Sequence, residues 1–502
     1  MKVKLIAACL LAGLLLVLLS TITERRPSPV ALVDIDAGVR WVDCWFDNTW
    51  DLNIRCGQLT TTGEDGRFTL AFLVFESASA ERRPDPLVYL AGGPGAASQV
   101  AADQVENWVY WLERADLSRD FIVFDQRGTG RSQPQWGCRQ YDRFARRVLA
   151  SAIDLEEELR RGAEVLRGCW ARLARQGFKP DYFSTRASAG DVLLLMEQLG
   201  YQRWNLFGVS YGSRLALAVA ARRPAGLRSA VLDSVYPLDK GLVSEWPWLL
   251  AHALQRFWHY CGVEAACGVG AADLEALFWR QMRQLARNPR TFTVSSWHGR
   301  APYKVVVNDQ RLLSIAFSAL YDVYTIEKLA GALQGLERGE TQLLASLTET
   351  FTNYALEPGF NSVTYFAVEC ADNPPVSEAS YQAAVQAFPD LAAYTESAWR
   401  YDVCPELAAG TGTSWRPPQL AGAGGGLAAH PPMLLLSGGL DPVTPPEWAV
   451  ELAARRPNSQ HLVFEQIGHA VVSSSDCVHQ LLRAYLDAPG QPLSLDCGGS
   501  PP

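Results

Sequence analysis

The first part of the chain alternates short apolar runs with turn residues. Runs at residues 39–46, 52–59 and 68–75 predict three β-strands. Two further runs, at residues 87–90 and 121–124, are continuously apolar and end in glycine-rich loops. Such runs are typical of buried parallel strands, whose following loops lie at the carboxyl edge of a sheet.

Strand-like and helical patterns alternate between residues 139 and 232. Helices are predicted at residues 139–176, 187–199 and 211–223, and strands at residues 204–209 and 227–232. Two of the helices end at stop signals, Gly200 and Pro224. The order strand, helix, strand, helix, strand predicts an α/β fold with a mostly parallel, doubly wound sheet covered by helices on both faces.

The pattern changes after residue 236. Residues 237–427 are mostly helical in pattern, with examples at 274–285, 312–324 and 329–336, and strand-like runs resume at 433–436 and 461–464. A helical block that interrupts a doubly wound sheet indicates an inserted cap. We therefore expect an α/β catalytic domain formed by residues 35–236 and 428–502, and a mainly helical cap formed by residues 237–427.

The N-terminus has the composition of an export signal. Lys2 and Lys4 precede an apolar run at residues 5–22, and residues 1–26 predict a signal peptide or a membrane anchor. No good small-x-small cleavage site follows the run, since cuts after Ser20 or Thr23 are poor, and the length of the run lies at the lower edge of a membrane-spanning helix. We expect an exported protein, periplasmic or extracellular, and leave open its anchoring in a membrane through residues 5–22.

The cysteines agree with export. Cys9 lies in the apolar N-terminal run, and the other ten of the eleven form an even set, which indicates disulfide bonds in an exported chain. Sequential pairing is the simplest arrangement, although the sequence alone does not fix it. It joins Cys44 to Cys56, Cys138 to Cys169, Cys261 to Cys267, Cys370 to Cys404 and Cys477 to Cys497. The sequence has no Cys-x-x-Cys pair or His-rich cluster, so no metal site is predicted.

Composition narrows the range of partners. Apolar residues make up 48% of the chain, which is enough for a large core. The net charge of −8 argues against nucleic acid as a partner. No run of like charges is long enough to form an interaction tail.

Residues 208–212 match the motif Gly-x-Ser-x-Gly between a predicted strand and a predicted helix. In that context Ser210 occupies a tight turn, where the flanking glycines relieve crowding and a helix N-terminus lies beside the hydroxyl. The alternative is a glycine-bounded strand–helix turn without chemistry. The context favours Ser210 as a catalytic nucleophile.

A nucleophilic serine requires a base and an acid that orients the base. His469 and Asp441 each follow a strand-like run in the last part of the chain, in the order Ser, Asp, His that suits this arrangement. Asp233, at the end of an earlier strand, is the competing acid. Asp441 is favoured because its loop, rich in glycine and proline, suits a held and exposed carboxylate.

An oxyanion hole requires two backbone N–H groups. One is expected from Tyr211, the residue after the nucleophile, and one from the glycine-rich loop at residues 92–95. Gly93 is the favoured second donor, with Gly92 as the alternative.

Together, the motifs resemble a known family. The segments that carry the resemblance are residues 92–95, 125–132, 208–213, 438–445 and 468–469. They resemble the proline iminopeptidase and tripeptidyl aminopeptidase branch of the α/β-hydrolases, over about residues 87–232 and 433–486. The exported, cysteine-rich form is more similar to the secreted bacterial tripeptidyl aminopeptidases. Ala91 stands where the smaller iminopeptidases have His, which argues against a simple proline iminopeptidase.

The resemblance implies the α/β-hydrolase fold and the release of N-terminal residues or short peptides from a peptide substrate, without a cofactor. Such enzymes hold the free α-ammonium of the substrate with acidic residues of the cap. Residues 368–372 resemble the segment that supplies them, so Glu369 and Asp372 are the candidate substrate-binding residues. The alternative is that both are surface acids beside a disulfide.

Two other functions stay open. An exported carboxylesterase or lipase-like hydrolase would have the same triad and would prefer simple esters and blocked substrates. A binding protein that keeps the fold without catalysis would not react with a fluorophosphonate probe. The order Ser210, Asp441, His469 favours a hydrolase.

Overall fold

A nine-stranded sheet is the frame of the molecule in this computed structural model, which describes residues 38–64, 66–263, 267–268, 270–373, 377–409 and 430–493. The strand order is β1-β2-β3-β5-β4-β6-β7-β10-β11. Pairing is antiparallel from β1 to β5 and parallel from β5 to β11. The strands are β1 (Gly38–Val42), β2 (Asn53–Thr61), β3 (Phe68–Glu76), β4 (Arg83–Leu90), β5 (Arg119–Phe124), β6 (Trp204–Val209), β7 (Leu227–Asp233), β10 (Met433–Gly438) and β11 (Ser459–Phe464).

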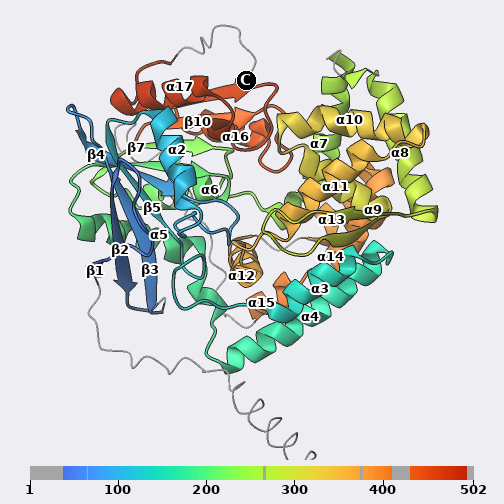
Figure 1. Cartoon of the computed structure of the whole chain (residues 1–502), viewed down its shortest axis with the longest axis horizontal. Coiled ribbons are helices and arrows are strands. Elements are labelled where there is room, and N and C mark those ends of the chain that lie inside the picture. Colours follow the sequence, from blue (N-terminus) through green and yellow to red (C-terminus); the bar gives the residue numbers. More distant parts are fainter. Residues whose placement is uncertain are drawn as a thin grey trace, which may run out of the picture. The chain divides into compact units, whose positions relative to one another are not determined.

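Helices cover both faces of the sheet, because its central strands are apolar on both sides. In β4, Leu87 belongs to the core beneath α2 and α17, whereas Val88 and Leu90 belong to the core beneath α5, α6 and α16. The predicted doubly wound, mostly parallel sheet is therefore confirmed (Figure 1). These helices are α2 (Val105–Ala115), α5 (Thr185–Leu199), α6 (Tyr211–Ala221), α16 (Pro446–Ala454) and α17 (Asp476–Asp487).

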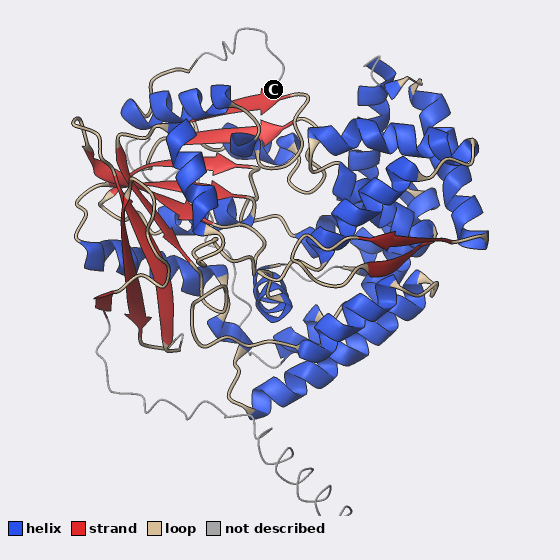
Figure 2. Ribbon diagram, viewed as in Figure 1, coloured by secondary structure: helices blue, strands red, loops and turns tan. Residues whose placement is uncertain are grey.

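The chain between β7 and β10 is mostly helical and lies largely on the other side of the molecule (Figures 1 and 2). It has a separate hydrophobic core. Its helices are α7 (Leu242–Val263), α8 (Ala271–Arg287), α9 (Asp309–Ala319), α10 (Val323–Glu337), α11 (Gln342–Ala355), α12 (Ser362–Asp372), α13 (Glu378–Ala387), α14 (Ala392–Arg400) and α15 (Cys404–Ala409). We refer to this segment, residues 237–427, as the cap; its status as a separate domain stays a prediction.

Helices from outside the predicted cap limits also contact it. The helices α3 (Arg139–Leu149) and α4 (Leu155–Arg175) precede α5 in the chain, yet α4 packs against α14, and α3 packs against the cap strand β9 (Tyr303–Val307). Arg311 of α9 forms an ion pair with Glu158 of α4 at 2.9 Å. The described residues from Gly38 onward form one compact unit.

Two details of the cap differ from the sequence prediction. The segment 312–324, predicted as one helix, is broken: α9 ends at Ala319 and α10 begins at Val323. The break occurs because the Asp322 carboxylate accepts a hydrogen bond from the Tyr324 N–H and so caps a new helix. In addition, the cap contains an unpredicted antiparallel hairpin, β8 (Arg290–Val294) with β9 (Tyr303–Val307).

Four of the five predicted disulfides are confirmed. They join Cys44 to Cys56, Cys138 to Cys169, Cys261 to Cys267 and Cys370 to Cys404. The fifth predicted pair includes Cys497, which lies outside the described residues, as do the predicted signal or anchor at residues 1–26 and Cys9. Among the helices that the structure describes, none combines the length and the hydrophobicity of a membrane span.

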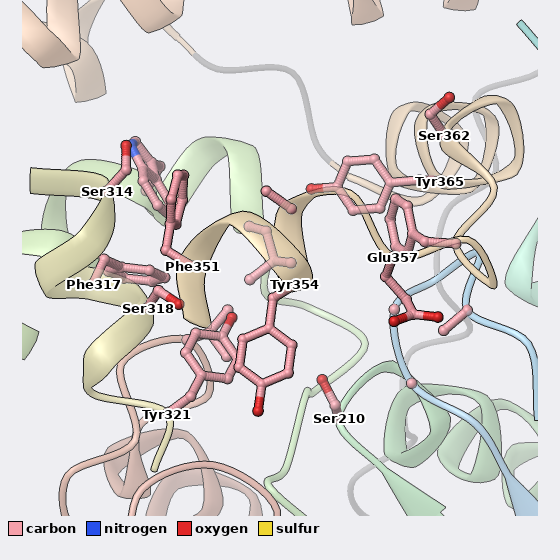
Figure 3. Close-up of a pocket in the computed structure, with 18 of the residues that line it drawn as sticks. Ser210, Ser314, Phe317, Ser318, Tyr321, Phe351, Tyr354, Glu357, Ser362 and Tyr365 are labelled. Carbon is pink, nitrogen blue, oxygen red and sulfur yellow. The ribbon is translucent and has the colours of Figure 1, made fainter. Parts of the chain in front are cut away.

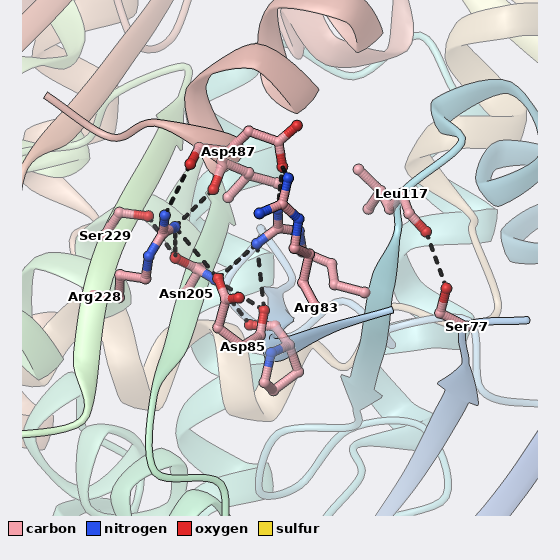
Figure 4. Close-up of polar contacts among 11 residues, drawn as sticks. Ser77, Arg83, Asp85, Leu117, Asn205, Arg228, Ser229 and Asp487 are labelled. Carbon is pink, nitrogen blue, oxygen red and sulfur yellow. Dashed lines mark hydrogen bonds and ion pairs between the residues drawn. The ribbon is translucent and has the colours of Figure 1, made fainter. Parts of the chain in front are cut away.

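A polar network fixes α17 to the amino ends of the central strands (Figure 4). Arg119 donates hydrogen bonds to Asp85 (2.6 Å) and to Asp487 at the end of α17 (2.7 Å). Asn205 donates to Asp85 (2.8 Å) and accepts from Ser229 (2.7 Å). Since buried polar groups are costly without partners, this network stabilises the strand register at the amino ends of the strands, opposite the edge formed by their carboxyl ends.

Candidate active site

The three residues of the predicted triad lie at the same edge of the sheet because of the strand register. Ser210 follows β6, Asp441 follows β10 and His469 follows β11. In the register, Val209 of β6 pairs with Asp233 of β7, and β7, β10 and β11 are parallel neighbours. Their carboxyl ends therefore share one sheet edge, as expected for sites in doubly wound folds.

Ser210 occupies a strained turn between β6 and α6. Its backbone has φ 57° and ψ −124°, a conformation that side-chain-bearing residues rarely adopt. The turn requires glycine on both sides: a Cβ on Gly208 would lie 2.3 Å from the Gly212 carbonyl oxygen, and a Cβ on Gly212 would lie 1.9 Å from that of Leu90. The Ser210 N–H donates to the Asp233 carbonyl (2.9 Å), which fixes the turn to β7.

His469 is paired with Asp441 by a short hydrogen bond. The distance from His469 Nδ1 to Asp441 Oδ2 is 2.8 Å. The Asp441 carboxylate is held, as predicted, but the expectation that it is exposed is wrong, because it is fully buried. It also accepts hydrogen bonds from the N–H groups of Val443 and Thr444 (2.9 Å each) and from the Thr444 hydroxyl (2.7 Å). The carboxylate therefore has one fixed orientation toward the imidazole, which leaves Nε2 as the ring nitrogen available to a nucleophile.

The competing acid, Asp233, contacts the backbone and not the imidazole. Its two carboxylate oxygens accept hydrogen bonds from the N–H groups of Val471 (2.9 Å) and Val472 (2.8 Å). These residues follow His469, so Asp233 holds the histidine loop in place. The geometry thus favours Asp441 as the orienting acid and makes Asp233 a positioning residue.

Burial and charge act in opposite directions on these groups. Burial lowers the pKa of His469, but the charge and hydrogen bond of Asp441 outweigh it, with a smaller effect of Asp233, and the net pKa is raised. Burial raises the pKa of Asp441, but the charge of His469 and the hydrogen bonds outweigh it, and the net pKa is lowered. Burial raises the pKa of Asp233 to about 6. Asp441 is therefore ionised and stabilises a protonated His469.

The loop at residues 92–95 lies against the nucleophile. A Cβ on Gly92 would lie 3.1 Å from the Ser210 Cβ, so this position requires a very small residue. Gly93, the predicted oxyanion donor, has a φ of 112°, which favours glycine. Tyr211 is the first residue of α6, so its N–H has no partner within the helix. Tyr211 directly follows Ser210, and Gly92 and Gly93 line the same cavity as Ser210, so the choice of Gly93 over Gly92 as the second donor stays a prediction.

Sequence reasoning missed the residues that hold this loop. Asp125 accepts hydrogen bonds from the N–H groups of Ser98 (2.7 Å) and Arg131 (2.6 Å), and Gln126 donates to the Ala91 carbonyl (2.9 Å). Residues 125–132 contributed to the family resemblance without a role being assigned to them. The structure shows that the start of this motif forms hydrogen bonds to both sides of the loop at residues 92–95, at Ala91 and at Ser98.

One large cavity, about 1760 Å³, connects the strand ends with the cap. On the sheet side it is lined by Gly92, Gly93, Ser210 and His469. On the cap side it is lined by many aromatic residues, among them Phe317, Tyr321, Phe351, Tyr354 and Tyr365 (Figure 3). Typical ligand pockets measure about 300–1,000 Å³, so this cavity is larger than the pockets that hold most small ligands.

Tyr321 links the cap to the histidine loop. Its carbonyl accepts a hydrogen bond from the His469 N–H (2.9 Å), and its ring packs edge-on against the imidazole at 5.0 Å between centroids. A Cβ on Gly468 would lie 2.5 Å from this carbonyl oxygen. The contact depends on the break between α9 and α10, which the sequence did not reveal.

The two predicted substrate-binding acids, Glu369 and Asp372, lie behind the cavity wall. They are 2% and 4% exposed, so the alternative that they are surface acids is wrong. Glu369 accepts hydrogen bonds from the Tyr236 hydroxyl (3.3 Å) and the Asn373 amide, and Asp372 accepts from the Thr185 N–H (3.1 Å) and hydroxyl. Tyr236 lines the cavity, whereas neither acid is among the described residues that line it.

Within the described ranges no group of three or more His, Cys, Asp or Glu side chains is arranged to hold a metal ion. A hydroxyl in a strained turn, a buried Asp–His pair and a nearby glycine-rich loop are elements that suit acyl transfer through a covalent intermediate.

Comparisons with known proteins give the same class of fold and chemistry. A family model described as alpha/beta hydrolase fold matches residues 85–475. Tripeptidyl aminopeptidase of Streptomyces lividans is 26% identical over 368 residues, 67% of this chain and 64% of that protein. Carboxylesterase B of Mycobacterium tuberculosis is 27% identical over 442 residues, 81% and 78% of the two chains. Serine protease Hip1 of Mycobacterium bovis is 24% identical over 481 residues, 89% and 88%. The chain thus spans less than two thirds of the length of the tripeptidyl aminopeptidase that it matches.

Proposed function

The chain is a hydrolase that belongs to the alpha/beta hydrolase fold family, and on that premise we propose that it is an exported serine aminopeptidase that releases N-terminal residues or short peptides. Its catalytic triad is Ser210, Asp441 and His469. The observation that carries this proposal is that Ser210 and His469, which is hydrogen-bonded to Asp441, both line one large cavity beneath the cap.

The reaction proceeds by acyl transfer. His469 Nε2 takes the proton of the Ser210 hydroxyl as its oxygen attacks the substrate carbonyl, and the N–H groups of Gly93 and Tyr211 stabilise the resulting oxyanion. The protonated His469 then donates to the leaving amine, while the Asp441 carboxylate stabilises the imidazolium. Water, activated by the same histidine, releases the acyl group from Ser210. None of these steps requires a cofactor.

The cap supports a peptide substrate. Its aromatic lining suits apolar side chains, and the size of the cavity suits a ligand longer than a simple acyl group. A tripeptidyl aminopeptidase and a serine protease are among the similar proteins. A peptide with a free N-terminus is therefore the proposed partner of the site.

The disulfides support export. Disulfides form and persist in oxidising compartments, and four join the described residues. We propose a periplasmic or extracellular location. N-terminal sequencing of the mature protein tests whether residues 1–26 are removed or stay as an anchor.

Substrate preference tests the proposal. Purified protein is assayed with aminoacyl and tripeptidyl reporters that carry either a free or an acetylated N-terminus, and with short-chain esters. We expect faster release from the free form, and mass spectrometry of a digested peptide library then gives the number of residues removed. Equal or better activity on esters and blocked substrates would contradict the proposal and indicate a carboxylesterase, the activity named for one similar protein.

A further inference from the structure

A cap segment is hydrogen-bonded to residues 95–97. These residues continue the glycine-rich loop at residues 92–95 that is proposed to form the oxyanion hole, and we refer to residues 92–97 as the oxyanion loop. The Ala97 N–H donates to the Gly359 carbonyl (2.9 Å), and the Asn361 N–H donates to the Gly95 carbonyl (2.8 Å). Ala96 and Phe360 pair between these bonds as an antiparallel bridge. The segment between α11 and α12 thus behaves as a short strand added to the loop that faces Ser210, so its position relative to the nucleophile is set by backbone bonds.

Glu357 lies at the start of this segment and lines the cavity together with Ser210. In Figure 3 the Glu357 carboxylate and the Ser210 side chain face the same part of the cavity. Glu357 Oε1 accepts the Gly359 N–H (3.2 Å), and Oε2 lies 3.2 Å from His298 Nε2. A carboxylate has about four acceptor positions, so these two contacts orient Glu357 and leave capacity for a ligand.

The other acids that line the cavity, within the part of the chain that the structure describes, are Asp142, Glu158, Asp322 and Asp402. Glu158 accepts hydrogen bonds from two cap side chains (2.6 and 2.9 Å), Asp322 caps α10, and Asp402 accepts a backbone N–H (2.9 Å). Asp142 lies in the first turn of α3. None of these four lies on a segment that the described contacts tie to the oxyanion loop. Glu357 is therefore the acid whose position is coupled to the reacting carbonyl.

We propose that Glu357 binds the α-ammonium of the substrate, and that it fills the role that the sequence assigned to Glu369 and Asp372. This inference rests on the proposed aminopeptidase function. An ammonium donates charge-assisted hydrogen bonds to a carboxylate, whereas an acetylated amine has neither the charge nor the extra donors. The span from Glu357 to Ser210 then determines how many residues lie between the free N-terminus and the cleaved bond.

The test compares four proteins: wild type, Glu357→Gln, Glu369→Gln and Glu340→Gln. The first substitution keeps a side-chain oxygen for the Gly359 N–H, so it removes the charge with little loss of shape. Glu340 is a cap glutamate that pairs with Arg338 outside the cavity (2.9 Å) and is the matched control. For each protein, kcat and KM are measured with the same peptide reporter bearing a free or an acetylated N-terminus.

We expect Glu357→Gln to lower the ratio of kcat/KM for the free over the acetylated reporter by about 10- to 100-fold, mainly through KM. Glu340→Gln leaves the ratio unchanged. Labelling by a fluorophosphonate probe reports whether Ser210 is still reactive in each variant. An unchanged ratio in Glu357→Gln, or a loss of the ratio in Glu369→Gln alone, would overturn the assignment while the aminopeptidase function stands. A wild type without preference for the free N-terminus would overturn both.

Discussion

The strand ends and the cap both contain buried carboxylates, but these carboxylates differ in whether they carry a charge. At the strand ends, Asp441 is buried, accepts backbone N–H groups and is ionised beside His469. In the cap, Glu369 is similarly buried, but burial raises its pKa to about 7, because the influence of Arg214 and two hydrogen bonds does not offset desolvation. Burial of a carboxylate therefore does not by itself define a site; the partners decide whether it carries charge.

The two regions also differ in how they are positioned. The residues at the strand ends are fixed by the ladder of a parallel sheet, which is common to proteins of this architecture. The cap residues are fixed by irregular features such as the break at Asp322 and the isolated bridge between Ala96 and Phe360. We therefore expect the residues at the strand ends to determine the rate of the chemical step and the cap residues to determine which substrates bind. Substitutions in each region test this expectation.

Replacing the nucleophile has the largest expected effect. Ser210→Ala lowers kcat/KM by about 10⁴-fold or more, because the covalent route is removed. A fluorophosphonate probe labels wild type and not the variant, and circular dichroism checks that the variant folds. Equal labelling of both proteins would place the nucleophile elsewhere.

Substitutions of Asp441 and Asp233 distinguish the acid that orients the His469 imidazole from the acid that holds the loop after His469. Asp441→Asn lowers kcat by about 10³- to 10⁴-fold, since the imidazole loses its orienting carboxylate. Asp441 raises the pKa of His469 above its ordinary value of 6.5, and His469 acts as a base only when it is unprotonated. Wild-type activity therefore increases as the pH rises through a value above 6.5. In Asp441→Asn the same increase in activity should occur at lower pH.

Asp233→Asn is the matched control for Asp441→Asn. It leaves one of the two N–H groups of Val471 and Val472 without an acceptor, so we expect a loss of about 1–3 kcal/mol in stability with at most a roughly tenfold change in kcat. The change in kcat is measured from pH–rate profiles, and the change in stability is measured by urea denaturation. A larger kcat loss in Asp233→Asn than in Asp441→Asn would exchange their roles.

Disulfides probe the stability of the cap. Replacing Cys370 and Cys404 by serine opens a link of sequence separation 34, whereas replacing Cys261 and Cys267 opens one of separation 6. Chain entropy predicts losses of about 4 and about 2 kcal/mol in the free energy of unfolding. Chemical denaturation of both double variants measures the difference; the reverse order would show that strain or residual structure, and not loop length, dominates.

The smallest expected effect concerns Glu369. Its pKa is about 7 in the folded state against 4.5 ordinarily, so the folded protein keeps a proton that the unfolded chain loses. Stability from this group is therefore lost as pH rises from about 4.5 to 7, by on the order of 1–3 kcal/mol. Glu369→Gln does not titrate, so the melting temperature of the variant relative to wild type should increase between about pH 5 and 7. A constant difference would mean that Glu369 is ionised throughout.

Much of the sheet was predictable because apolar periodicity and glycine-rich turns are local signals. The parallel strands, the turn at Ser210 and four disulfides agree with sequence expectations. The cap was less predictable, and the β8–β9 hairpin and the break at Asp322 were missed. The reason is that the cap consists of several short elements of similar composition, which do not repeat a regular pattern as the strands of the sheet do.

The sequence by itself determined the order along the chain of the nine strands of the main sheet and placed Ser210, Asp441 and His469 after strands, since these depend on neighbours along the chain. The tertiary structure alone decided that Asp441 and not Asp233 contacts the imidazole. It also decided that Glu369 lies behind Tyr236 while Glu357 lines the cavity. The physical reason is that desolvation and hydrogen-bond partners are set by residues distant in sequence, which no local pattern encodes.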